Sequence, residues 1–155
     1  MKWIASDIET YAKEKEYVDT IVVPLIPFGL ENNLKGTVSA GEYISIISHE
    51  LERQLRGRLL LLPPFTYLNS EPMEEKVKRL AEWHNEVIGN GASYVVYLTS
   101  DVEWKNAEDR LEDTLVWLPS IPLEHMDNEY KMETVSTQVK QVLQIVTKKW
   151  QNSPK

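Results

Sequence analysis

Runs of apolar residues alternate along the chain with segments in which apolar residues recur every three or four positions. The apolar runs span residues 20–27, 59–62, 93–98 and 114–118. Continuous apolar runs without polar alternation are typical of strands that are covered on both faces, as parallel strands are. Pro24 in the first run lacks a backbone donor, so we expect a bulge or a sheet edge near it.

The helical periodicity predicts helices over residues 39–57, 71–88, 104–112 and 128–150. Ser39-Ala40-Gly41-Glu42 forms a capping box that opens the first, and Gly57 is suited to end it. The first twenty residues predict a short strand at Trp3-Ile4 and a helix capped by Asp7. Strands that alternate with helices, with connections long enough for right-handed crossovers, predict one three-layer α/β/α domain over residues 1–155. Its sheet is expected to be mostly parallel, with about four to five strands.

Composition excludes several classes of protein. The chain has 155 residues, 42% of them hydrophobic and none of them Cys, so intrinsic disorder, a disulfide scaffold, a thiolate nucleophile and a Cys-ligated metal are set aside. The longest wholly apolar run, residues 59–65, is too short to span a membrane. The first residues carry no secretory signal. We therefore expect a cytoplasmic protein without a membrane partner.

The net charge of −7 is concentrated in one part of the chain. Residues 101–129 hold nine acidic and two basic residues, and the remaining residues balance. Such an acidic band repels phosphate backbones, so we expect no nucleic-acid partner. The band is interpreted either as a solvated face or as a docking surface for a basic protein; its candidate docking residues are Glu108, Asp109, Glu112 and Asp113.

Ligands of open α/β sheets bind outside the carboxyl ends of the strands. The segments that follow the predicted strands carry acids, amides and hydroxyl groups that could bind a small polar ligand, although turns use the same residue types. The candidate residues, called the rim residues below, are Glu31, Asn32, Asn33, Tyr67, Asn69, Ser100 and Asp101.

Motifs for catalysis are absent from the sequence. It has no dinucleotide-binding glycine pattern, no P-loop and no Gly-x-Ser-x-Gly elbow. His49, His84 and His125 have no short metal-ligand spacing. His84 lies on an apolar helix stripe, which favours a core or boundary position. We therefore expect no catalytic residue, no cofactor and no metal.

The opening Met1-Lys2-Trp3-Ile4 with Asp7, the segment of residues 13–20 and then Val22-Val23-Pro24-Leu25-Ile26-Pro27 resemble a family of short uncharacterised proteins of spore-forming Gram-positive bacteria. That family is classed as a domain of unknown function. The resemblance covers essentially the whole chain and implies a bacterial cytoplasmic origin, but no activity.

Residues 20–100 resemble the creatininase-type amidohydrolases, through Gly29-Leu30-Glu31-Asn32-Asn33 after one strand and Leu62-Pro63-Pro64-Phe65-Thr66-Tyr67 after another. Glu31 matches the acid of the family's Glu-x-His metal motif. Asn33 stands in place of its histidine, and Thr99-Ser100-Asp101 replaces a Gly-rich His motif. Without those imidazoles a divalent metal loses most of its ligands. The resemblance therefore implies the fold without the hydrolysis.

These observations favour a non-catalytic domain that binds a small ligand or a protein. The alternative is a divergent hydrolase that uses Glu31 or Asp101 as base or metal ligand. A homodimer built on the tryptophan-bearing surfaces is also left open.

Overall fold

The computed structural model describes residues 1–152; residues 153–155, which the sequence analysis places in the same domain, lie outside the described residues. Eleven elements follow one another in the described chain. They are α1 (Ala5–Lys13), the 3-10 helix η1 (Lys15–Tyr17), β1 (Thr20–Phe28), α2 (Leu34–Gln54), β2 (Leu59–Leu61), β3 (Phe65–Leu68), α3 (Met73–Gly89), β4 (Tyr94–Thr99), the 3-10 helix η2 (Val102–Arg110), β5 (Thr114–Trp117) and α4 (Asn128–Asn152).

The five strands form one sheet in the order β2-β1-β4-β5, with β3 also paired to β1, and all of these pairs are parallel. The predicted α/β fold with a mostly parallel sheet is therefore confirmed. β2 pairs with β1 as far as Val22, and β3 pairs with it from Leu25 onward. Pro24 lies between these two registers. The backbone carbonyl of Val22 accepts from Leu62 N, and alternate residues of a strand face the same neighbour, so the missing N–H of Pro24 falls in the gap between β2 and β3.

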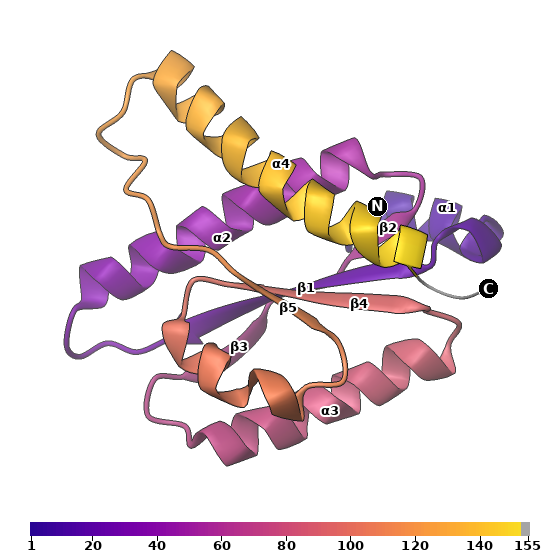
Figure 1. Ribbon diagram of the computed structural model, residues 1–155, viewed down its shortest axis with the longest axis horizontal. Helices are drawn as coiled ribbons and strands as arrows, with labels where there is room; N and C mark the ends of the chain where they lie inside the picture. Colours follow the sequence, from indigo (N-terminus) through magenta and orange to yellow (C-terminus); the bar gives the residue numbers. More distant parts are fainter. Residues whose placement is uncertain (153–155) are drawn as a thin grey trace.

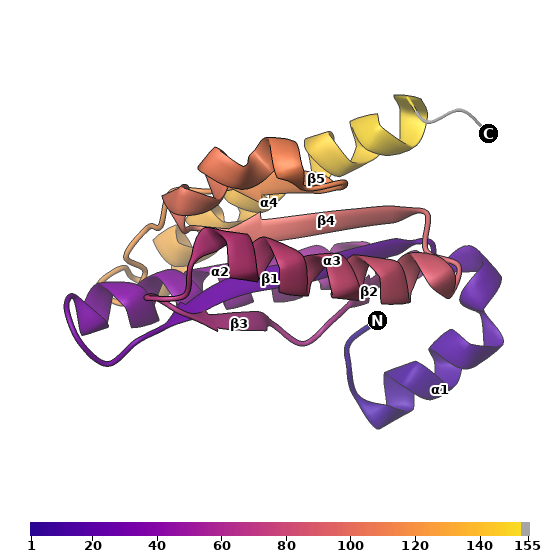
Figure 2. The same ribbon diagram turned by 90° about the horizontal axis from the view of Figure 1, so that it is seen from below.

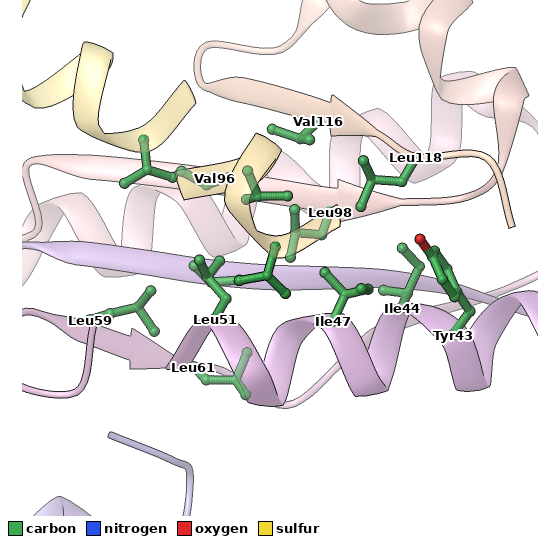
Figure 3. Packing of buried hydrophobic residues seen from close by; sticks show 14 of the residues in the cluster. Tyr43, Ile44, Ile47, Leu51, Leu59, Leu61, Val96, Leu98, Val116 and Leu118 are labelled. Atoms are coloured by element: carbon green, nitrogen blue, oxygen red, sulfur yellow. The ribbon is translucent and has the colours of Figure 1, made fainter. Parts of the chain in front are cut away.

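Helices α2 and α4 cover one face of the sheet (Figure 1). Ile44, Ile47 and Leu51 of α2 point toward the strands (Figure 3), as their predicted stripe requires. Val139, Val142 and Val146 of α4 complete this core. Gly41 brings α2 close to β1, since a Cβ at this position would lie 2.9 Å from Cγ2 of Ile26.

The opposite face is covered by α3 and η2 (Figures 1 and 2). Its core is more aromatic: the ring of Phe65 contacts those of Tyr67, Trp83 and Trp104, with centroid distances of 6.1, 5.2 and 6.3 Å. The Trp104 side chain is fully buried here, so this tryptophan of the acidic band belongs to the core.

The segment before β1 lies at the amino end of the strands, and α1 stands off from the sheet (Figure 2). No residue of α1 is buried. The segment is held by Met1, whose ammonium group lies 3.0 Å from Oε2 of the buried Glu52 and donates to the carbonyl of Leu59. The carbonyl of Met1 accepts from Leu61 N. These bonds anchor Met1 to α2 and β2, and so they set the position from which the chain continues into Trp3 and α1.

Several local predictions are wrong. Helix α2 ends at Gln54 with Leu55 as its C-cap, so Gly57 does not end it. Helix α2 begins at Leu34, so Ser39 and Glu42 lie inside it and form no capping box; Leu34 and Val38 of the first turns are exposed, which hides this part of the helix from the apolar pattern. Trp3-Ile4 form no strand, and Asp7 lies in the first turn of α1, where it accepts from Lys2 N instead of capping the helix. Residues 65–68, expected as loop, form β3 because they pair with the far half of β1.

Candidate functional site

The carboxyl ends of β1 and β4 mark the point where the strand order reverses. The chain leaves β1 toward β2 on one side and leaves β4 toward β5 on the other, which is the arrangement that opens a crevice in doubly wound sheets. Six of the seven rim residues follow strands at this edge, and Tyr67 lies within β3.

Two of the rim residues, Tyr67 and Asp101, are joined by a hydrogen bond. The hydroxyl of Tyr67 donates to Oδ2 of Asp101 (2.7 Å) and accepts from Nε1 of Trp104 (2.8 Å). Oδ1 of Asp101 accepts from Glu103 N, where it caps η2. Burial, followed by the charge of Asp101, raises the pKa of Tyr67 far above its ordinary value. Both carboxylate oxygens of Asp101 are therefore engaged in hydrogen bonds within the fold.

A buried lysine lies under this pair. Nζ of Lys76 lies 4.7 Å from the Tyr67 ring centroid, 5.6 Å from that of Trp104 and 3.9 Å from Oε2 of Glu103. Its side chain is only 1% exposed. The sequence interpretation missed Lys76, although its spacing of three and four residues from Met73 and Leu80 places it on the apolar stripe of α3.

The other rim residues stay apart from this pair. Glu31, Asn32 and Asn33 are exposed, and the two asparagines have φ of 47° and 51°, a turn conformation that Asn tolerates well. Asn69 packs against Gly29, where a Cβ would lie 2.5 Å from its Nδ2. The hydroxyl of Ser100 is buried without a hydrogen-bond partner among the described residues.

The four acidic docking candidates fall into two pairs. Glu108 and Asp109 are exposed on η2. Glu112 and Asp113 instead hold His84 of α3, with Nε2 2.7 Å from Oε2 of Glu112 and Nδ1 2.5 Å from Oδ2 of Asp113. Oδ2 of Asp113 also accepts from the hydroxyl of Tyr97 (2.9 Å), and burial followed by this carboxylate raises the pKa of Tyr97. Half of the candidate docking set thus ties α3 to the start of β5.

A shallow hollow of about 370 Å³ lies between the end of β1 and the first turns of α2. Its lining is mostly apolar and includes Phe28, Leu30, Leu34 and Val38, all exposed. None of the seven rim residues lines it.

A second cavity of about 430 Å³ lies between α1, the β2 side of the sheet and the carboxyl-terminal half of α3, within the size range of small-molecule sites. Three aromatic and several aliphatic side chains line it, with a few polar groups among them. The lining residues are Trp3, Tyr11, Lys15, Ile21, Leu60, Leu62, Pro63, Glu82, Trp83, Glu86, Val87 and Asn90. We call it the α1 cavity.

Sequence reasoning missed the α1 cavity entirely. Trp83 precedes His84 on the predicted helix, but nothing in the pattern shows that α1 lies across from it. Trp83 is held by an edge contact with Phe65 at an interplanar angle of 82°, and the ammonium of Met1 anchors the segment that carries Trp3. The ring of Trp83 is thus held by a contact with the core, whereas that of Trp3 is 57% exposed on the anchored segment.

Within residues 1–152, no group of three or more His, Asp or Glu side chains has an arrangement that could hold a metal ion. None of the helices in that range is long and apolar enough to cross a bilayer.

Comparison with known proteins gives two matches. Residues 9–150 match the family model described as "Protein of unknown function (DUF2487)". The chain is 37% identical over 150 residues to the "Uncharacterized protein YpiF" of Bacillus subtilis (strain 168), a match that covers 97% of this chain and 98% of that protein. No solved structure matches. The chain therefore belongs to the DUF2487 family of proteins of unknown function.

Proposed function

We propose that this protein is a non-catalytic domain that binds a small molecule in the α1 cavity. The observation that carries the proposal is the cavity itself: about 430 Å³ in volume, with an apolar base that includes the buried Ile21 and Leu60 and with a few exposed charged and amide side chains in its lining. An apolar site with few polar groups is the usual form of a ligand pocket. Burial of an apolar body between α1 and α3 would supply the affinity.

The hydrogen bonds and positions of the two acidic rim residues favour ligand binding over hydrolysis as the function. The divergent-hydrolase alternative requires Glu31 or Asp101 to act as a base or a metal ligand. Asp101 is occupied by Tyr67 and by the first turn of η2, and Glu31 lies in an exposed loop with no hydrogen bond or ion pair to Asp101 among residues 1–152. To act as a base or a metal ligand, Asp101 would have to give up one of these two hydrogen bonds.

A thermal-shift screen of the purified protein against a few hundred metabolites tests the proposal. A ligand that binds only the native state at one hundred times its Kd adds about 2.7 kcal/mol to the free energy of unfolding. This corresponds to a rise in Tm of roughly 5–10 °C for a chain of this size. We expect at least one metabolite to give a saturable rise.

Two matched variants locate the site. Val87 lines the α1 cavity, whereas its neighbour Ile88 does not and is 39% exposed. Val87→Phe fills the cavity and should abolish the ligand-dependent rise, and Ile88→Phe should keep it. A rise that survives Val87→Phe but is lost in Glu31→Ala or Asp101→Ala would move the site to the carboxyl edge and contradict the proposal.

A further inference from the structure

The tryptophans of this chain differ in whether the side chain of a lysine or arginine lies over the indole ring. Arg58 lies over the ring of Trp150 (3.7 Å to the centroid), Lys76 lies over that of Trp104 and Lys105 over that of Trp117. Among residues 1–152 no Lys or Arg occupies the ring of Trp3 or of Trp83. These two are the tryptophans that line the α1 cavity.

The carboxylates of the α1 cavity also lack a cation. Glu82 and Glu86 stand four residues apart on α3, so they share one face of the helix and repel each other. Neither forms an ion pair within the described part of the chain, and Glu86 only accepts a 3.4 Å hydrogen bond from the amide of Asn90. By contrast Glu50, Glu52 and Glu71 are each paired with an arginine.

Lys15 is the one basic residue in the lining. It is exposed, and its Cε lies 3.9 Å from where a Cβ of Gly91 would stand. With one ammonium and two carboxylates, the charged groups of the lining sum to a net negative charge. An anionic ligand would meet two like charges for every opposite one, whereas a cation meets the reverse.

We propose that the ligand class of the α1 cavity is an organic ammonium ion with an apolar body, held by the rings of Trp3, Tyr11 and Trp83 and by the carboxylates of Glu82 and Glu86. This inference rests on the proposed function and adds the charge of the ligand to it. Aromatic rings attract a desolvated ammonium through their quadrupole, and a substituted ammonium is less strongly hydrated than a metal ion or a primary amine. The carboxylates supply the net attraction that selects charge, while the apolar base of the cavity binds the body.

Three aromatic probes that differ in charge test the inference by isothermal titration: benzyltrimethylammonium, benzyl alcohol and phenylacetate. We expect the cation to bind at least about fivefold more tightly than the neutral probe and phenylacetate to bind most weakly. Raising the salt concentration should weaken the binding of benzyltrimethylammonium and leave the binding of benzyl alcohol unchanged. Val87→Phe should abolish binding of the cation.

Charge-matched variants on the same helix give the control. The double variant Glu82→Gln with Glu86→Gln should weaken the affinity for benzyltrimethylammonium by about fivefold or more and leave the affinity for benzyl alcohol unchanged. Glu74→Gln with Glu75→Gln removes the same charge from the first turn of α3, outside the cavity lining, and should leave both affinities unchanged. All four positions are exposed, so the fold should tolerate the changes.

The outcomes separate the two proposals. If benzyl alcohol or phenylacetate binds as tightly as the cation and Val87→Phe abolishes that binding, the cation inference is overturned while the ligand-binding function stands. If the cation binds best but the paired Gln variants behave alike, the carboxylates have no role and the inference is overturned. If none of the three probes binds at tens of millimolar but a metabolite gives a saturable rise in Tm that Val87→Phe abolishes, the cation inference is overturned and the ligand-binding function stands. If no metabolite gives such a rise either, both proposals are overturned.

Discussion

Single hydroxyl groups decide how the carboxyl edge of the sheet is held. The hydroxyl of Tyr67 bridges Nε1 of Trp104 and Oδ2 of Asp101, so Tyr67→Phe leaves the buried indole N–H without an acceptor. We expect a loss of about 1–3 kcal/mol in the free energy of unfolding. Tyr17→Phe makes the same change at a residue that is 64% exposed and should cost nothing measurable. Urea denaturation of both variants checks the prediction; equal stabilities would show that the bridge does not matter.

The hydroxyl of Tyr43 is the opposite case. It is buried in the α2 side of the core (Figure 3) and has no hydrogen-bond partner within residues 1–152. A buried polar group without a partner destabilises a core, so Tyr43→Phe should leave the free energy of unfolding at pH 7 unchanged or raise it by up to about 1 kcal/mol. A clear loss of stability would mean that the hydroxyl has a partner in solution.

Tyr43 also predicts a dependence on alkaline pH. Burial raises its pKa to about 12, so the folded chain keeps the proton that the unfolded chain releases near pH 10. The contribution to stability is therefore complete below pH 10 and is lost as the pH rises toward 12. At pH 11 the wild type should have lost about 1 kcal/mol more than Tyr43→Phe, relative to each protein at pH 8. Parallel pH profiles of the two proteins would contradict this account.

At the scale of elements, the approach of α2 to the sheet depends on one glycine. A Cβ at Gly41 would meet Cγ2 of Ile26 at 2.9 Å, and the helix would have to shift away from β1. We expect Gly41→Ala to cost about 1–2 kcal/mol, despite the better helix propensity of Ala. Gly89 ends α3 with no heavy atom within 4 Å of such a Cβ, so Gly89→Ala should be neutral or stabilise. Thermal unfolding of the pair decides, and a stabilising Gly41→Ala would refute the close approach.

The elements also show where sequence reasoning succeeds and where it stops. The runs at 20–27, 59–62 and 93–98 predicted strands because residues covered on both faces must be apolar throughout. β3 was missed because only four residues pair, after a Pro-Pro break, and the hydrogen bonds that define them come from the distant half of β1. The start of α2 was missed because Leu34 and Val38 are exposed and carry no stripe signal. Local pattern reports burial, which is missing at the exposed start of α2. In β3, buried Phe65 and Tyr67 do alternate with exposed residues, but four residues are too few for the alternation to stand out.

At the scale of the whole molecule, the predicted parallel strands drew attention to the segments at their carboxyl ends, and so to Tyr67 and Asp101. The sequence could not show that their polar groups bind each other, because that depends on the packing of β3 against η2. The α1 cavity could not be predicted from the hydrophobic pattern for a similar reason, because it too depends on long-range packing. Its walls come from residues 3–15, Ile21, and residues 60–63 and 82–90. Only the docking of the amino-terminal segment on Glu52 and Leu59 closes this set.

The five tryptophans serve as reporters for the place where a ligand binds. The indole N–H of Trp104, Trp117 and Trp150 each donates to an acceptor within the fold, at Tyr67, at the carbonyl of Ser100 and at Thr20. Trp3 and Trp83 line the α1 cavity. A ligand in the cavity and a ligand at the carboxyl edge therefore act on different indoles.

The most direct measurement is a nitrogen-15 NMR titration of these five indole N–H signals with whichever of the three aromatic probes binds most tightly. If the ligand binds in the α1 cavity, the signals of Trp3 and Trp83 move together and saturate, while those of Trp104, Trp117 and Trp150 stay in place. Movement of Trp104 and Trp117 with Trp3 and Trp83 unchanged would place the ligand at the carboxyl edge and contradict the account.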